Sequence, residues 1–306
     1  MRGEHATAHR PSPTRARRRG PRDLIAFGFL APAFVLYGVF VLKPTVDVFI
    51  LSLFDWDGIS PVRDWVGLDN FAKLLKDSVF WIAFQHNLLW LAIIVTFNVS
   101  LGLVTATVLA MRIRGRLLFQ LAVFLPVIQA PIVVALIWRW MYNPDGLINR
   151  ALEAVGLGGL AHPWLGDTTL ALPALALAAG WAGFGLAVVI FLAGMQSVDP
   201  TLYDAARIDG ANGRQLFRHV TIPGLRNVIT VVILLEMIGA FQVFDVIWGT
   251  TQGGPVRATE MLATYMFKRG IQQGEYGFGS AIAVVFMAIV LVFAIASIVL
   301  RERGQD

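Results

Sequence analysis

The stretch DAARIDGANGRQLFRHVTIP, residues 204–223, is polar and compact, yet it lies between two of the most apolar segments of a 306-residue chain. Hydrophobic residues make up 57% of the chain, charged residues make up 15%, and the mean hydropathy is +0.67. A composition of this kind is typical of an integral membrane protein. The apolar segments on both sides of the stretch should therefore be membrane helices.

Six apolar segments are long enough to cross a bilayer, which takes about 20 helical residues. They are residues 24–42, 81–110, 117–141, 170–194, 228–248 and 277–300. Because a backbone inside the bilayer must satisfy its own hydrogen bonds, helices are the expected structure of these segments. We predict an all-α, polytopic membrane protein with six transmembrane helices.

The basic residues alternate between the two sides of this topology. Sixteen lie in the N-terminal tail, the second link, the fourth link and the C-terminal tail, against eight in the three other links. The positive-inside rule then places both termini and the opening stretch in the cytoplasm. The predicted organisation is a disordered basic tail (1–22), a first transmembrane helix with its outer link (23–80), a core domain (81–300) with a cytoplasmic loop at 195–226, and a short cytoplasmic tail (301–306).

The sequence holds none of the motifs that would bind a nucleotide or a metal. It has no phosphate-binding loop, no zinc-protease helix, no serine-hydrolase elbow and no cysteine. The arginine-rich N-terminal tail has no aromatic residue, so we expect a topology anchor and no nucleic-acid partner. We predict no catalytic residue, no metal and no cofactor, and any ATP that drives this protein would be bound by another chain.

The outer links contain two predicted amphipathic helices and a turn. Residues 67–77 and 143–159 carry apolar side chains at helical spacing, as at Phe71, Leu74 and Leu75. Such helices could cap the bundle or dock an external partner, and the sequence leaves both open. TQGGP, residues 251–255, predicts a rigid turn, because glycine frees the backbone and proline restricts it.

One carboxylate falls in the middle of a predicted span. A charge near the bilayer centre is costly, so Glu236 should face the protein interior or a watery cavity. It could belong to a solute pathway or make a structural hydrogen bond between helices. Gln242 and Asp245 follow at a spacing that does not form one helical face with it. Asn87 and Asn98 are expected to make contacts between helices.

Within the polar loop, the residues predict two short helices. Asp199 before Pro200 favours a helix start, because the carboxylate accepts from free amides and proline is tolerated in the first turn. Gly210 should end this helix without the steric cost of a Cβ atom. A second helix should run from Ala211 until Pro223 stops it. On physical grounds alone this would be an amphipathic hairpin at the membrane surface.

The order of residues in the loop closely resembles the EAA loop of permease subunits in binding-protein-dependent ABC importers. That pattern runs EAA, three residues, GA, five residues, F, two residues, I or V, one residue, LP. The matching residues here are Asp204, Ala205, Ala206, Gly210, Ala211, Phe217, Val220, Ile222 and Pro223. Asp204 replaces the usual glutamate and Ile222 the usual leucine.

The resemblance extends over most of the chain. LAPAFVLYGVFVLKPTVDVFILSLFDWDG, GLDNFAKLL, WAGF at Trp181 and FDVIWGTTQGGP look like the sugar-importer branch that includes the maltose and glycerol-3-phosphate permeases. It implies a type I ABC importer permease fold in the bacterial cytoplasmic membrane, surrounded by lipid. It also implies a second permease subunit, an ATPase dimer that binds ATP and Mg, and an extracytoplasmic solute-binding protein.

The resemblance assigns two sets of residues. Coupling to the ATPase is expected from Asp204, Ala205, Ala206, Asp209, Gly210, Ala211, Phe217 and Pro223. The pathway for a sugar or small oligosaccharide is expected at Gly183, Leu186, Glu236, Gly239, Ala240 and Val243, although its glycines could equally serve helix packing. Alternatives are an importer for another solute such as glycerol phosphate, an intramembrane enzyme, and a solitary receptor or scaffold.

Overall fold

A computed structural model describes residues 21–111 and 114–303 of the chain, which divides into two units, Met1–Asp47 and Val48–Asp306. Most of the predicted basic tail, residues 1–20, lies outside the described residues, as do 112–113 and 304–306. Residues 21 and 22, placed in that tail from the sequence, instead begin a helix. Residues 301–303, expected in the C-terminal tail, continue the last helix.

The first predicted span begins and ends too early. Helix α1 (Pro21–Tyr37), a π-helical turn η1 (Gly38–Leu42) and α2 (Lys43–Leu51) follow one another, and residues Phe29–Leu51 form the apolar span. The backbone N–H of Lys43 donates to the carbonyl of Gly38, which widens the turn before Pro44. A wider turn relieves the clash between a proline ring and the carbonyl one turn earlier, so the helix continues.

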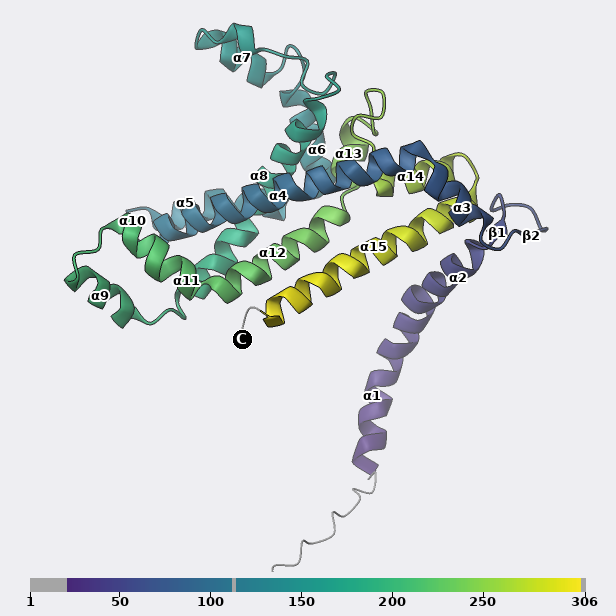
Figure 1. Cartoon of the computed structure of the whole chain (residues 1–306), viewed down its shortest axis with the longest axis horizontal. Helices are drawn as coiled ribbons and strands as arrows, with labels where there is room; N and C mark the ends of the chain where they lie inside the picture. The colour runs from purple at the N-terminus through teal and green to yellow at the C-terminus, as the bar shows by residue number, and fades with distance from the viewer. Residues whose placement is uncertain (1–20, 112–113, 304–306) are drawn as a thin grey trace, which may run out of the picture. The chain divides into compact units, whose positions relative to one another are not determined.

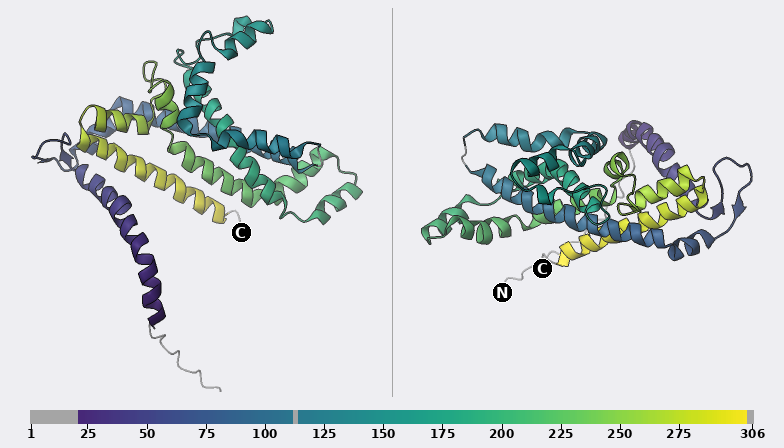
Figure 2. Two further views of the ribbon diagram at one scale, coloured as in Figure 1. Left: turned by 180° about the vertical axis from the view of Figure 1, so that it is seen from behind. Right: turned by 90° about the horizontal axis from the view of Figure 1, so that it is seen from above.

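The second unit is organised around the long helix α4 (Ser78–Ala110), which packs along α8 (Ala171–Met195) and α12 (Arg226–Phe241). At 33 residues α4 is about 50 Å long, so it extends beyond a hydrocarbon core of about 30 Å. Helix α15 (Tyr276–Arg303) lies beside α12 (Figures 1 and 2). The helices approach closely where side chains are small, since a Cβ on Gly102 would lie 2.8 Å from the Cβ of Ala187.

The third predicted span is not one straight helix. It consists of α5 (Arg116–Phe124), a 3₁₀ turn η2 (Leu125–Ile128) and α6 (Pro131–Met141), with a bend of 101° between the two halves. Pro126 and Pro131 remove two backbone donors, and Ala130 before the second proline is extended. Both effects are expected of proline, which has no backbone donor and favours an extended conformation at the residue before it.

The fifth predicted span also ends early. Helix α12 stops at Phe241, residues 242–244 are not helical, and the short helix α13 (Asp245–Thr250) follows. Non-helical backbone at membrane depth is tolerated where it lines a cavity. Such a cavity is found at this break.

Among the described residues, four helices are long and apolar enough to span a membrane alone, and two bent pairs raise the number to six. The pairs are Arg116–Ile128 with Pro131–Met141, and Gly213–Gly224 with Arg226–Phe241. The links predicted to lie outside contain the predicted helices, α3 (Asp69–Lys76) and α7 (Leu147–Ala154), a 3₁₀ turn η3 (Gly158–Leu160), and a hairpin of β1 (Phe54–Asp55) with β2 (Asp64–Trp65).

The two ends of α4 carry different structures (Figure 1). At its Ser78 end, α3, α14 (Leu262–Phe267) and α15 share a buried cluster that includes Leu74, Phe80, Tyr265 and Phe278. A π-helical turn η5 (Lys268–Gln272) then joins α14 to α15. At the Ala110 end of α4 lie the short helices of the polar loop.

Candidate functional site

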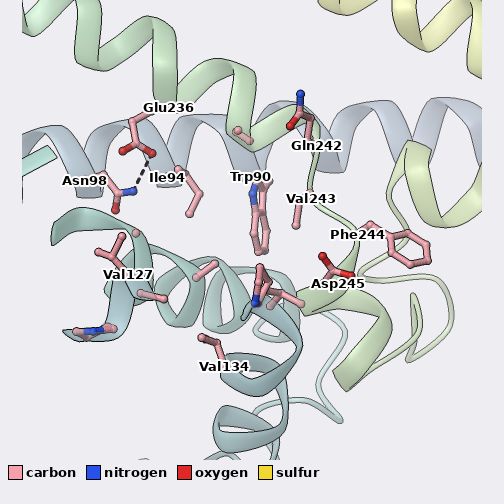
Figure 3. A pocket seen from close by; sticks show the side chains of 18 of the residues that line it. Trp90, Ile94, Asn98, Val127, Val134, Glu236, Gln242, Val243, Phe244 and Asp245 are labelled. Carbon is pink, nitrogen blue, oxygen red and sulfur yellow. Dashed lines mark hydrogen bonds between the residues drawn. The ribbon is translucent and has the colours of Figure 1, made fainter. Parts of the chain in front are cut away.

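A cavity of about 310 Å³ lies where α4, η2, the start of α6, α8 and α12 meet the break after α12. Its volume is near the lower limit of about 300–1,000 Å³ for small-molecule sites. Figure 3 shows Glu236 and Asn98 at one end of the cavity and Val243 and Asp245 towards the other. The cavity is therefore built from segments far apart in the sequence.

Glu236 lies where the sequence predicted it, facing the interior. The side-chain amide of Asn98, which is only 2% exposed, donates a hydrogen bond of 2.8 Å to Glu236 Oε2. The prediction that Asn98 and Asn87 contact other helices is confirmed, because Asn87 Oδ1 accepts from the backbone N–H of Leu262 at 2.9 Å. Glu236 thus both lines a cavity and joins α12 to α4.

The structure brings five of the six predicted pathway residues together. The residues that line the cavity are Gly183, Glu236, Gly239, Ala240 and Val243. Leu186 is 45% exposed on α8 and does not line it. A Cβ on Gly239 would meet no atom within 4 Å, so this glycine borders open space, whereas a Cβ on Gly183 would lie 3.2 Å from the Asn98 amide nitrogen.

Sequence reasoning missed other polar residues of the cavity. Gln242 and Asp245 line it together with Glu236, as does Gln129 from the bend between α5 and α6. The expectation that Gln242 and Asp245 do not share a surface with Glu236 assumed one continuous helix, and the break after Phe241 makes it wrong. The polar residues at the end of an apolar segment were the available signal.

The first helix of the polar loop, α9 (Pro200–Ile208), starts and stops where the sequence predicted. Asp199 accepts from the backbone N–H of Thr201 at 2.9 Å, which confirms the predicted cap. This hydrogen bond lowers the pKa of the Asp199 carboxyl below its ordinary value. Gly210 follows α9 with φ of +83°, a conformation that costs other residues energy, so the predicted helix end is also confirmed.

The prediction that Pro223 stops the second helix is wrong. Helix α10 (Gly213–Leu216), a π-helical turn η4 (Phe217–Thr221) and α11 (Ile222–Gly224) run on through the proline. The backbone N–H of Ile222 donates to the carbonyl of Phe217, so the turn before Pro223 is widened as it is before Pro44. The helix ends at Leu225, which is fully buried.

The side chains of the loop divide into an inner and an outer set. Phe217 and Val220 pack against the buried cluster that contains Leu225, and the hydroxyls of Tyr203 and Thr221 lie 3.1 Å apart. Of the predicted coupling residues, those that remain exposed are Asp204, Ala205, Asp209, Gly210 and Pro223, whereas Ala206 and Ala211 are half-buried.

The outer surface of the loop has a charged pair, an apolar tip and a hollow. Asp204 pairs with Arg207 on its own helix at 2.9 Å, and both side chains are largely exposed. Ile208 is 86% exposed. An open depression of about 270 Å³ is bordered by residues that include Ala206, Gly210 and His219. The loop thus presents an irregular surface to its surroundings.

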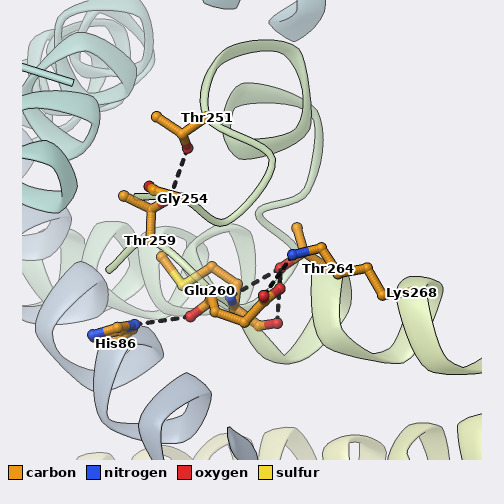
Figure 4. A network of polar contacts seen from close by, with 8 residues as sticks. His86, Thr251, Gly254, Thr259, Glu260, Thr264 and Lys268 are labelled. Carbon is orange, nitrogen blue, oxygen red and sulfur yellow. Dashed lines mark hydrogen bonds and ion pairs between the residues drawn. The ribbon is translucent and has the colours of Figure 1, made fainter. Parts of the chain in front are cut away.

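A buried polar network lies at the opposite end of α4, where the TQGGP turn meets α14 (Figure 4). Glu260, 2% exposed, pairs with Lys268 at 2.5 Å and accepts from the Thr264 hydroxyl at 2.7 Å. A Cβ on Gly253, where φ is +89°, would lie within 2.8 Å of both charged groups. The turn therefore packs directly on the ion pair, and His86 of α4 contacts the Glu260 carbonyl.

Most of the cavity and the whole polar loop lie in a part of the chain that matches a known family. Residues 98–302 match the family model described as "Binding-protein-dependent transport system inner membrane component". The chain belongs to this permease family. The permease is 34% identical over 286 residues to the probable ABC transporter permease protein YurN of Bacillus subtilis (strain 168), covering 92% of this chain and 98% of YurN.

Further relatives agree. The permease is 31% identical over 307 residues to the diacetylchitobiose uptake system permease protein NgcF of Streptomyces coelicolor, covering 94% of this chain and 87% of NgcF. Its fold is similar to that of a bacterial ABC transporter involved in the import of the acidic polysaccharide alginate, with a TM-score of 0.80, 22% identity, and coverage of 94% and 98%. The predicted family and the all-α ABC importer permease fold are thus confirmed, and the family consists of transport components of the inner membrane.

Proposed function

We propose that this permease is one membrane half of an importer that moves a sugar or small oligosaccharide into the bacterial cytoplasm. A second permease subunit completes the pathway, and an extracytoplasmic protein delivers the solute. Two ATPase subunits bind ATP and Mg and drive the cycle. The family name, a binding-protein-dependent transport system, supports the solute-binding protein, and the name of YurN, an ABC transporter permease, supports an ATPase partner. The relative NgcF, named for diacetylchitobiose uptake, supports a sugar.

The observation that best supports this proposal is that α12 follows the polar loop directly in the chain. Helix α11 ends at Gly224, and α12 begins at Arg226 after a bend of 71°. Helix α12 in turn carries Glu236, at the cavity. A movement imposed on the loop would therefore be transmitted along one helix to the cavity wall, as in the rigid-body switches of other two-state proteins.

In this proposal the loop 195–226 lies in the cytoplasm and docks on the ATPase through its outer set of residues. The exposed residues Asp204, Ala205, Asp209 and Gly210 and the half-buried Ala206 and Ala211 would contact the ATPase. Phe217 would instead hold the loop to the bundle, because it packs inward. Asp204 is engaged with Arg207, so this pair would meet the ATPase as a unit.

The orientation follows from the same placement. With the loop in the cytoplasm and six crossings, both termini are cytoplasmic, and the segment 81–300 forms the core that carries the pathway. Helices α3 and α7 and the TQGGP turn then face the outside, where they are available to the solute-binding protein. The cavity lies between the two groups of links.

The coupling role is tested by two substitutions on the loop in the assembled transporter. Gly210→Trp meets no atom of this chain within 4 Å at its Cβ but forces a bulky residue into the left-handed conformation, and Asp204→Lys removes the pair with Arg207. The expected result is reduced co-purification of the ATPase and reduced solute-stimulated ATP hydrolysis. Asp64→Lys, a charge reversal on the outer hairpin, is the matched control. Unchanged association and hydrolysis in both loop variants would contradict the docking role.

A further inference from the structure

Among the described residues, the cavity wall carries acidic but no basic side chains. Among the described residues that line it, two carry carboxyl groups, Glu236 and Asp245, three carry amides, and none is lysine, arginine or histidine. An anionic group placed here would find no positive partner on this wall. Taking an unpaired anion out of water is expensive, so the wall disfavours carboxylates and phosphates.

The position of the Asn98 amide depends on two glycines of α8. Gly180 and Gly183 of α8 leave the space that the amide of Asn98 occupies, because a Cβ on either would lie 3.2 Å from an amide atom of Asn98. The Asn98 nitrogen is used by Glu236, which turns the amide oxygen away from the carboxylate. Gly183, predicted as a pathway residue, thus contributes through Asn98.

Two amide oxygens of residues in the cavity wall are enclosed by the surrounding helices. Within the described residues, the amide oxygens of Asn98 and Gln129 are buried and have no hydrogen-bond partner. Both residues line the cavity, and Asn98 is 2% exposed. A solute can reach the other polar side chains of this wall, because Glu236 is half-buried and Gln242 and Asp245 are exposed. Carboxylate groups only accept hydrogen bonds, so this wall favours a ligand that supplies donors.

We propose that Asn98 and Glu236 form a specificity site that selects uncharged solutes rich in hydroxyl donors, such as neutral sugars and polyols, and rejects solutes that carry a carboxylate or phosphate. The site rests on the proposed transport function and adds to it the charge class of the solute. Glu236 contacts the solute, and Asn98 positions the Glu236 carboxyl. Trp90 and Phe244 supply apolar surface on the same wall.

The charge class of the transported solute is measured with the whole transporter and its solute-binding protein in ATP-loaded vesicles. The vesicles receive an equimolar mixture of neutral disaccharides (lactose, cellobiose and diacetylchitobiose) and disaccharides that contain a uronate, and mass spectrometry identifies what accumulates inside. Neutral solutes should accumulate at least about tenfold more than the acidic ones. Accumulation of the acidic solutes to the same extent would overturn this inference and leave the transport function standing. ATP-dependent accumulation of neither class would contradict the transport function as well.

Substitutions in the permease distinguish its own selectivity from that of the binding protein. Glu236→Ala should reduce neutral uptake about tenfold, whereas Glu236→Gln, which keeps an acceptor, should restore most of it and narrow the ratio between neutral and acidic uptake. An unchanged ratio in Glu236→Gln, or equal loss in both variants, would overturn the assignment.

The positioning role of Asn98 needs a milder change, because Asn98→Leu could disturb assembly. Gly183→Ala places a Cβ 3.2 Å from the Asn98 nitrogen and should shift the amide by a few tenths of an ångström. It should raise the half-saturating solute concentration several-fold while the maximal ATPase rate stays unchanged. Leu177→Ala, at an exposed position of the same helix, is the control. An unchanged half-saturating concentration in Gly183→Ala would contradict the positioning role.

Discussion

The hydrogen bond between Asn98 and Glu236 can be measured in a double-mutant cycle on the full-length permease. Asn98→Leu removes the donor and keeps the branching of the side chain, and Glu236→Met removes the acceptor and keeps an unbranched chain of similar length. The two atoms lie 2.8 Å apart and the donor residue is 2% exposed, so water does not compete with the donor. Hydrogen bonds between membrane helices average about 0.6 kcal/mol and reach about 1.7 kcal/mol. Because a carboxylate accepts this bond, we expect a coupling energy of about 1–1.7 kcal/mol.

The free energies of unfolding of the four proteins are obtained by denaturant titration of the purified permease in micelles. A matched control cycle pairs Asn98→Leu with Gln242→Met, since both residues line the cavity and no hydrogen bond joins them. Its two effects should add within about 0.5 kcal/mol. If the Asn98 and Glu236 changes were also additive within this limit, the bond would not join α4 to α12, and the positioning argument would fail.

Three further outcomes follow from polar contacts outside the cavity. Glu260→Ala should destabilise the permease by about 3 kcal/mol in thermal unfolding, and the double change with Lys268→Met should cost less, because no unpaired charge is left buried. The carboxyl of Asp199 should titrate by NMR below its ordinary pKa of about 3.9, so the cap is present above that pH and is lost as the pH falls through the lower folded value. Tyr203→Phe, which breaks the contact with Thr221, should lower stability by about 1 kcal/mol and weaken the solute stimulation of ATP hydrolysis.

Local chemistry predicted the elements whose determinants lie close together in the sequence. The cap at Asp199 and the left-handed residue Gly210 depend on neighbouring atoms, and the structure contains both. The length and hydropathy of the apolar segments gave the number of spans, because the bilayer sets that length. The motif order of the loop gave the family.

The course of the helices at proline was not predictable in this way. Pro44 and Pro223 both lie inside continuous helices because a π-helical turn precedes them, whereas Pro131 accompanies a bend of 101°. All three remove a backbone donor, so the presence of a proline does not by itself distinguish a wider turn from a bend. The cavity could not be predicted for the same reason. Gln242 and Asp245 line it together with Glu236 only because α12 ends at Phe241.

The ion pair of Glu260 with Lys268 illustrates a second limit. The residues are eight positions apart, a spacing at which a straight helix does not bring two side chains into contact. They meet because Glu260 precedes α14 and Lys268 follows it, with the Gly253 turn packed against both. Such a contact depends on the path of the whole segment.

ATP-dependent uptake by a permease whose cavity has been filled tests the account most directly. Gly239 borders the cavity and its Cβ would meet no atom within 4 Å, so Gly239→Trp should fold and occupy the space. Leu235→Trp, at an exposed position of the same helix outside the cavity lining, is the control. The account predicts that Gly239→Trp abolishes accumulation of neutral sugar in vesicles while the assembled transporter still hydrolyses ATP. Wild-type uptake by this variant would contradict the claim that the solute passes through the cavity.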